Sequence, residues 1–241
     1  MIGRVGGKSK IKNVIIDKMP EHQIYVEPFI GGGSVFFSKE PVKVNIINDL
    51  DTDIYNIYKD MKDIGDKMIN KDFTPTRDKF NKLKNQKKFK NNIDRLYRNL
   101  YLSLNSYASS RKGYIGEQRE IFNELGKKYK TTKWKDFLNE NNVKIYNKDF
   151  CYLINKYDSN NTLFYLDPPY SKSTKDYDVS GIEPQKIFEC LENIKGKFIL
   201  SYDKSKDIKN IFKKYKFTTI KTIYGVSGRP QGIEEYLITN F

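Results

Sequence analysis

Histidine and cysteine are scarce in this sequence of 241 residues, which has one His and two Cys. A single histidine, His22, argues against histidine-based catalytic triads and histidine-rich metal sites, so we predict no metal site. Cys151 and Cys190 are too few for a disulfide framework or a zinc site, and we expect both to be reduced.

Long hydrophobic runs are absent as well. No apolar run approaches the roughly 20 residues that a membrane-spanning helix requires, and no signal peptide opens the sequence. We therefore expect a soluble, intracellular protein without a membrane partner, in the cytoplasm of a bacterium or in a virus-infected cell. The length suffices for one domain, or for a core with a modest insertion.

Positive charge is abundant and unevenly placed. The formal net charge is +14, and the segment from Arg77 to Lys135 has 17 Lys and Arg against 5 Asp and Glu, which gives +12. A composition bias of the whole genome would act along the entire chain, whereas this excess is local and interleaved with Tyr and Phe. It favours a polyanionic partner such as nucleic acid.

Apolar periodicity alternates between helical and strand spacing outside residues 69–132, which predicts an α/β core. Inside 69–132 the strand-like runs disappear and charged helical patterns dominate. We therefore predict a catalytic domain of residues 1–68 and 133–241 with a mostly helical insertion of residues 69–132. The expected core elements are helices at Lys10–Met19, Ser34–Ser38, Asp53–Met61, Pro184–Ile194 and Lys206–Lys214, strands at Gln23–Glu27, Val42–Ile47, Val143–Tyr146, Leu163–Leu166 and Lys197–Ser201, and a closing antiparallel pair at Phe217–Tyr224 and Glu235–Asn240.

The most informative motif is Asp167-Pro168-Pro169-Tyr170, directly after the apolar run Leu163–Leu166. The two prolines end a buried strand and leave these residues at its carboxyl end, where open α/β sheets bind ligands. The Asp167 carboxylate and the Pro168 carbonyl can accept both N–H bonds of an exocyclic amine. Tyr170 offers a face on which a planar base can stack.

A second motif is the glycine-rich segment Tyr25–Phe37, which reads as a strand, a turn and the start of a helix. Its glycines allow close approach of a ligand to the backbone. Asp49 follows the next predicted strand, 18 residues after Gly31, at the distance expected for a carboxylate that binds ribose hydroxyls. The turn has neither the GxGxxG spacing of NAD sites nor a P-loop lysine, so it indicates a nucleoside cofactor of another kind.

Taken in order, these motifs resemble the DNA adenine-N6 methyltransferases of the Dam type, in which the glycine motif comes first, the target-recognition insertion second and DPPY third. The matching segments are Gly6–Lys8, Val26–Phe37, Asn48-Asp49, Lys148–Phe150, Tyr165–Tyr170, Gly196–Tyr202 and Glu235–Asn240. The resemblance implies a Rossmann-like methyltransferase sheet with helices on both faces and a C-terminal antiparallel hairpin. It also implies S-adenosylmethionine as the methyl donor.

The same resemblance implies roles for individual residues. The residues of the catalytic motif, Asp167, Pro168, Pro169 and Tyr170, would hold the target adenine. The cofactor site would contain Lys8, Phe29, Gly31, Gly33, Asp49, Asp149, Phe150 and Asp167. We further expect Arg95, Arg98 and Lys112 to bind DNA phosphates, and Tyr107 and Arg111 to contact base edges. Arg229, in the loop GVSGRPQG, is either a further phosphate contact or a free loop residue.

The expected reaction is transfer of a methyl group to an adenine flipped out of duplex DNA, because N6 is inaccessible within the stack. GATC is the commonest target in the family. A cognate restriction endonuclease and a monomer or weak dimer are also expected. Three alternatives stay open, namely an RNA adenine-N6 methyltransferase, a cytosine-N4 methyltransferase, against which Asp167 argues, and a catalytically silent nucleic-acid-binding protein.

Overall fold

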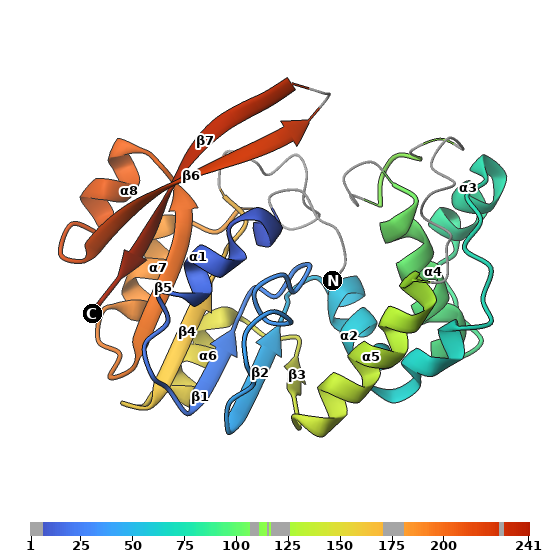
Figure 1. Ribbon diagram of the computed structural model, residues 1–241, viewed down its shortest axis with the longest axis horizontal. Helices are drawn as coiled ribbons and strands as arrows, with labels where there is room; N and C mark the ends of the chain where they lie inside the picture. Colours follow the sequence, from blue (N-terminus) through green and yellow to red (C-terminus); the bar gives the residue numbers. More distant parts are fainter. Residues whose placement is uncertain (1–6, 107–110, 115, 117–125, 171–180, 227–228) are drawn as a thin grey trace.

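The structure is a computed structural model that describes residues 7–106, 111–114, 116, 126–170, 181–226 and 229–241. Within these residues a seven-stranded sheet forms the centre of the molecule (Figure 1). Its strands are β1 Ile24–Glu27, β2 Val44–Asn48, β3 Lys144–Tyr146, β4 Thr162–Leu166, β5 Lys197–Asp203, β6 Lys216–Val226 and β7 Arg229–Thr239.

The strand order is β3-β2-β1-β4-β5-β7-β6. The first five strands are parallel, whereas β7 runs antiparallel to both β5 and β6. This arrangement confirms the predicted α/β sheet with a C-terminal antiparallel hairpin. The described α-helices are α1 Lys12–Ile16, α2 Thr52–Ile64, α3 Arg77–Asn85, α4 Asn92–Leu104, α5 Gly126–Glu140, α6 Phe150–Tyr157, α7 Pro184–Leu191 and α8 Lys206–Ile211. The described residues also form the 3₁₀ helices η1 Lys8–Lys10 and η2 Gly65–Met68.

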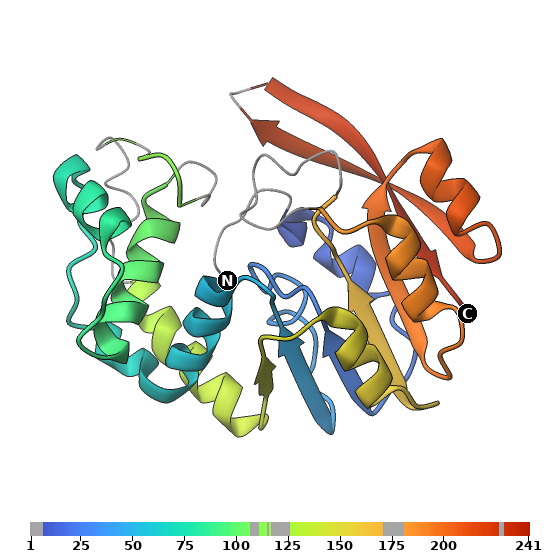
Figure 2. The ribbon, with the colours of Figure 1, turned by 180° about the vertical axis from the view of Figure 1, so that it is seen from behind.

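Both faces of the central parallel strands are covered, so β4 is buried along its whole length. Along β4, Leu163 packs into one core cluster and Phe164 into the other, as the alternation of side chains in a strand requires. The first cluster includes residues of α1, α2, α4 and α5. The second includes residues of α6, α7 and α8, which cover the face that Figure 2 shows in front.

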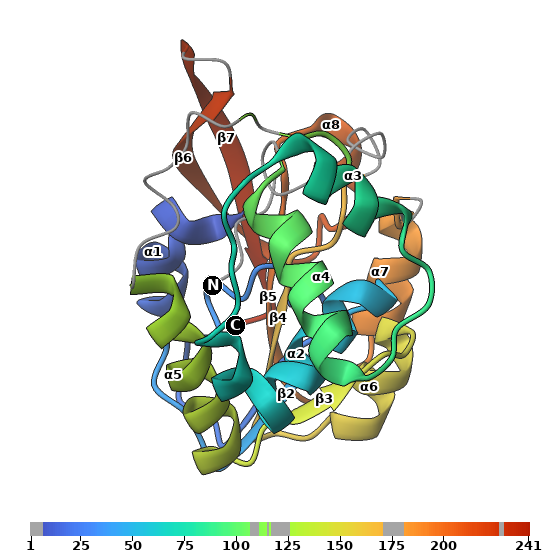
Figure 3. The ribbon, with the colours of Figure 1, turned by 90° about the vertical axis from the view of Figure 1, so that its right-hand side faces the viewer.

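The predicted helical insertion contains α3, α4 and the beginning of α5, which lie together beyond the β3 edge of the sheet (Figure 3). Leu96 and Leu100 of α4 share a core cluster with Ile54 and Ile57 of α2, so this part packs directly on the α/β core. Helix α5 runs through residue 132, and the domain boundary there stays a prediction. Across the described part of the chain, every helix is too short or too polar to cross a membrane.

One predicted helix is wrong. Residues 34–38, after the glycine turn, form consecutive turns instead of a helix. Short-range bonds hold the segment, in which the Phe37 amide donates to the Gly33 carbonyl and the Lys39 amide to the Val35 carbonyl. Because Val35 and Phe36 are buried in the core, tertiary packing rather than helical periodicity fixes this backbone.

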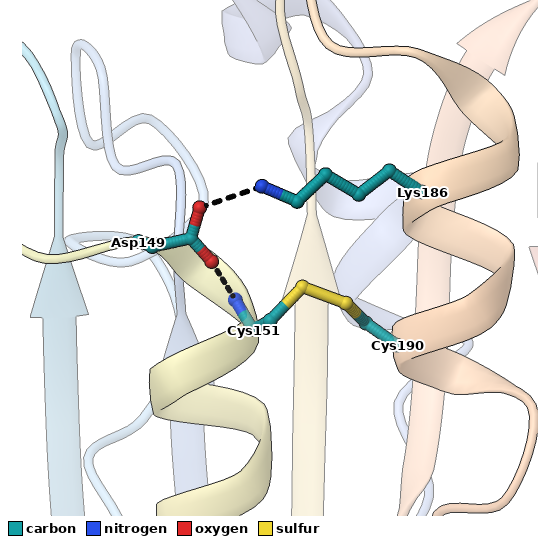
Figure 4. Close-up of a disulfide and its surroundings, with 4 residues drawn as sticks. All are labelled: Asp149, Cys151, Lys186 and Cys190. Atoms are coloured by element: carbon teal, nitrogen blue, oxygen red, sulfur yellow. Dashed lines mark hydrogen bonds and ion pairs between the residues drawn. A yellow bond between two sulfur atoms is a disulfide. The ribbon is translucent and has the colours of Figure 1, made fainter.

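The expectation that both cysteines are reduced is also wrong, because Cys151 and Cys190 form a disulfide with Cα atoms 5.6 Å apart. Cys151 lies in α6 and Cys190 in α7, and these helices pack side by side on one face of the sheet (Figure 4). Their separation of 39 residues conceals this proximity in the sequence.

Reduction of this disulfide is expected to lower the free energy of unfolding by about 2 to 4 kcal/mol, because the cross-link restricts the unfolded chain. Urea denaturation of the oxidised protein with and without dithiothreitol measures the difference. In the control variant Cys190→Ser, dithiothreitol should change nothing. Equal stability of oxidised and reduced wild type would contradict the prediction.

Candidate active site

The two sequence motifs meet at the carboxyl edge of the sheet. Strands β1 and β4 are parallel neighbours, so the glycine turn after β1 and the segment Asp167–Tyr170 after β4 emerge side by side. The strand order reverses between these two strands. Such a switch point is where open α/β sheets bind ligands.

Lys8, from η1, lies at the centre of this edge and is buried. Its Nζ atom is 2.8 Å from Oδ1 of Asp167 and 3.5 Å from Oε2 of Glu235. It also donates to the hydroxyl of Tyr170 over 3.2 Å. The structure therefore places Lys8 directly on the catalytic motif.

The charges around Lys8 determine the direction in which its pKa is shifted. Burial alone lowers the pKa of Lys8, but the neighbouring Asp167, Tyr170 and Glu235 outweigh burial and raise that pKa well above its ordinary value. Lys8 is therefore an ammonium ion at neutral pH. Its positive charge stabilises the ionised form of Asp167, whose side chain stays 23% exposed and accessible to a ligand.

Tyr170 is held from two directions. Its ring stacks on Tyr202 of β5 with centroids 4.8 Å apart, and its hydroxyl accepts the bond from Lys8. Burial raises the pKa of Tyr170 well above its ordinary value, so the phenol stays neutral. With Tyr202 against one face of the ring, a planar base would have to stack on the opposite face.

Beneath the motif, Glu27 at the end of β1 is buried and accepts a hydrogen bond of 2.9 Å from the Tyr25 hydroxyl. Burial raises the pKa of Glu27 well above its ordinary value, and the charge of Asp167 adds to the effect. Glu27 is thus a far weaker acid than an exposed glutamate.

The glycine turn is built around Asp49. Gly31 and Gly33 have φ angles of 46° and 70°, in the left-handed region that favours glycine. The Gly31 amide donates to Oδ2 of Asp49 over 2.9 Å, and the Asp51 amide donates to Oδ1 over 3.0 Å. A carboxylate oxygen can accept more than one hydrogen bond, so these contacts are compatible with a ligand hydroxyl at the same group.

Asn48 joins the turn to the loop after β3. Its amide nitrogen donates to the carbonyls of Pro28 and Lys148, over 2.8 and 3.0 Å, and its oxygen accepts from the Lys148 amide over 2.8 Å. These three hydrogen bonds hold the two loops together, and the rings of Phe29 and Phe150 pack with their centroids 5.2 Å apart.

Asp149 caps α6 by accepting from the Cys151 amide over 2.9 Å, and its other oxygen pairs with Lys186 over 2.9 Å (Figure 4). Aromatic rings beside the carboxylates of Asp49 and Asp149 fit a nucleoside, which presents a planar base and hydroxyl donors. The residues present thus fit the adenosyl cofactor that the sequence resemblance implies.

Three arginines expected at the DNA have carboxylate partners within the chain. Arg95 forms a bidentate pair with Asp60, over 2.6 and 2.8 Å. Arg98 lies 2.7 Å from Asp53, and Arg111 pairs with Asp51 and Asp53. These contacts join the insertion to α2, so the predicted phosphate and base contacts compete with ion pairs for the same guanidinium groups.

The remaining expected DNA contacts are Lys112, Arg229 and Tyr107. Lys112 is exposed, and its carbonyl accepts a bond from Lys84 over 2.6 Å. Arg229 begins β7 at the end of the hairpin, where its backbone pairs with Val226. Tyr107 lies outside the described residues. All three assignments stay predictions.

Two residues at the site escaped the sequence reasoning, namely Glu235 and Tyr202. Both stand in segments that match the family, but strand patterns do not say which side chain faces the motif. Within the described part of the chain, no group of three or more His, Cys, Asp or Glu side chains gathers as a metal site.

Comparison with known proteins adds independent evidence. Residues 5–226 match the family described as D12 class N6 adenine-specific DNA methyltransferases. The chain is 25% identical to the type II methyltransferase M1.LlaDCHI of Lactococcus lactis subsp. cremoris, over 98% of this chain and 93% of that protein. It is 28% identical to the type II methyltransferase M.MjaIII of Methanocaldococcus jannaschii, over 98% and 96%. A segment covering 24% of this chain is 37% identical to the DNA N-6-adenine-methyltransferase of Escherichia phage P1, where it covers 7%.

Proposed function

This chain belongs to the D12 class of N6 adenine-specific DNA methyltransferases, and on that premise we propose that it methylates N6 of an adenine flipped out of duplex DNA, with S-adenosylmethionine as donor. The observation that carries the proposal is the Asp167 carboxylate, held by Lys8 at the end of β4 and beside the glycine turn.

Asp167 and the Pro168 carbonyl accept the two N–H bonds of the adenine N6 amine, and Tyr170 stacks on the base. These acceptors orient the nitrogen lone pair, and alignment of the reacting groups is the main catalytic contribution. Asp167 need not be a strong base, because the amine becomes acidic only as it gains the methyl group.

The cofactor residues are Lys8, Phe29, Gly31, Gly33, Asp49, Asp149, Phe150 and Asp167. When bound, S-adenosylmethionine supplies an electrophilic methyl group on a sulfonium. Asp49 accepts the ribose hydroxyls, and Phe29 and Phe150 flank the adenine ring. Because Gly31 has no Cβ atom, the ligand can approach the backbone closely at this position.

The basic insertion binds the DNA. Its surplus of positive charge compensates phosphates, and each phosphate contact contributes to the salt dependence of binding. In Figure 1 the insertion helices and the β6–β7 hairpin rise on either side of the carboxyl edge of the sheet. Lys112, whose side chain is exposed, and Arg229 are proposed contacts. The guanidinium groups of Arg95, Arg98 and Arg111 also pair with carboxylates at the start of α2 or within it.

Lys112→Ala is expected to weaken DNA binding and to reduce the slope of log affinity against log salt concentration by about one, as loss of one phosphate contact requires. Arg98→Ala is the matched comparison, because Arg98 is buried and paired with Asp53. It should lower the unfolding free energy by about 2 to 4 kcal/mol. Fluorescence anisotropy with labelled duplex and urea denaturation measure the two effects. An unchanged salt slope for Lys112→Ala would contradict its assignment.

The proposal extends to biological context. GATC is the proposed target, a restriction endonuclease the proposed partner, and a monomer or weak dimer the proposed active form inside the cell. An RNA adenine-N6 methyltransferase would use the same motif, but the basic insertion between the two motifs favours duplex DNA.

The deciding experiment is methyl transfer from labelled S-adenosylmethionine to unmethylated genomic DNA, with total RNA as the parallel substrate. Nucleoside analysis identifies the product, and single-molecule sequencing maps the modified sites. We expect N6-methyladenine at one short DNA motif. N4-methylcytosine, methylation confined to RNA, or cofactor binding without any transfer would each reject the proposal.

A further inference from the structure

Glu235 lies against the catalytic motif although it comes from β7, far from the motif in sequence. It is buried, with 2% of its side chain exposed, and its Oε2 atom is 3.5 Å from Nζ of Lys8. The backbone of Glu235 pairs with Asp203 of β5, which fixes its height at the carboxyl edge of β4 and β5. Its position is therefore set by the sheet itself.

Lys8 is thus shared between two carboxylates, Asp167 at 2.8 Å and Glu235 at 3.5 Å. In such a buried environment, charges act strongly on one another. During methylation, positive charge develops on the N6 amine, which afterwards loses a proton to water.

Competition for Lys8 also affects Asp167 directly. A carboxylate that neutralises an ammonium ion alone is a weaker hydrogen-bond acceptor than one that shares it. Glu235 takes part of the interaction with Lys8, so Asp167 keeps acceptor strength for the incoming amine. The same contact fixes the Lys8 side chain beside Tyr170.

We propose that Glu235 is a positioning residue for methyl transfer, which acts through Lys8 to orient Asp167. The inference rests on the proposed function and adds to it a residue outside the catalytic motif. Glu235 does not touch the substrate in this role. Its effect reaches the amine through the Lys8–Asp167 pair.

The test compares Glu235→Gln with Glu234→Gln in the full chain. Glu234 is the neighbouring residue on β7, is 41% exposed and pairs with Lys204 at 2.7 Å on the opposite side of the strand. The two variants therefore remove the same charge from opposite faces. Rates are measured with labelled S-adenosylmethionine and unmethylated genomic DNA, and affinities by calorimetry and anisotropy.

For Glu235→Gln we expect kcat to fall about tenfold to a hundredfold, as a misplaced catalytic group does, with both KM values within about threefold of wild type. Glu234→Gln should match wild type. A fall in kcat with unaltered KM values is the readout that distinguishes positioning from a purely structural role, which would also weaken binding.

Glu235→Asp provides the check on folding, because it restores a carboxylate and should recover part of the lost kcat. Equal kcat for wild type and Glu235→Gln would overturn the inference. So would equal losses in the Gln and Asp variants accompanied by a lowered melting temperature. Absence of transfer by wild type would instead reject the proposed function.

Discussion

Asp167→Ala is expected to reduce the rate of methyl transfer to DNA by about a thousandfold or more, the scale of losing a preorganised charged partner of the reacting group. The variant removes the acceptor for the N6 amine and one of the two carboxylates that hold Lys8. Because Glu235 still pairs with Lys8, the ammonium ion retains a counterion and the fold should persist. Transfer of label to genomic DNA measures the loss.

Tyr170→Phe is the matched control for this prediction. It keeps the ring that stacks on Tyr202 and removes only the hydroxyl that accepts from Lys8. Its rate should fall by no more than about tenfold to a hundredfold, since a hydrogen bond to a charged group contributes about 1.5 to 3 kcal/mol. If Asp167→Ala melts cooperatively at the wild-type temperature and still methylates DNA at a comparable rate, Asp167 is not the amine acceptor.

Asp49→Ala is expected to weaken binding of the adenosyl cofactor about a hundredfold, or roughly 2.7 kcal/mol. The change removes the proposed acceptor of the ribose hydroxyls. It also deprives the Gly31 and Asp51 amides of their shared partner, so the glycine turn loses its fixed backbone. Calorimetric titration with S-adenosylhomocysteine measures the affinity without any dependence on turnover.

Asp63→Ala serves as the charge control for Asp49→Ala, because Asp63 is an exposed residue of α2 and its loss changes the net charge equally. Its cofactor affinity should equal that of wild type. A similar small effect in both variants would mean that Asp49 has no special role in the cofactor pocket. In that case the two hydrogen bonds from backbone amides to Asp49 would serve only to stabilise the turn.

Much of the fold was predictable because local patterns carry it. The apolar run before Asp167 predicts β4, and its four core residues are all buried in the structure. The order of strands and helices around it follows from alternating periodicities. The same reasoning gave a wrong prediction for the segment after the glycines. Val35 and Phe36 are apolar neighbours that are buried in the core, but the backbone that carries them forms turns rather than a helix.

The site was predictable only as far as motifs reach. Asp167, Asp49 and Lys8 stand in recognisable segments, but their distances depend on which strands are neighbours. The expected tasks of Arg95 and Arg98 illustrate the limit, since basic composition does not say that Asp60 and Asp53 lie within reach. The cysteine pair, likewise, depends on the packing of α6 against α7.

The Lys8 cluster draws together residues from both ends of the sequence. Asp167 follows Lys8 after the whole helical insertion, and Glu235 comes later still, on β7. Since β7 inserts between β5 and β6, its backbone must be complete before Glu235 reaches Lys8. A nascent chain in which β7 has not yet been made therefore lacks the third member of the cluster, and it should reach full activity on DNA only after β7 has joined the sheet.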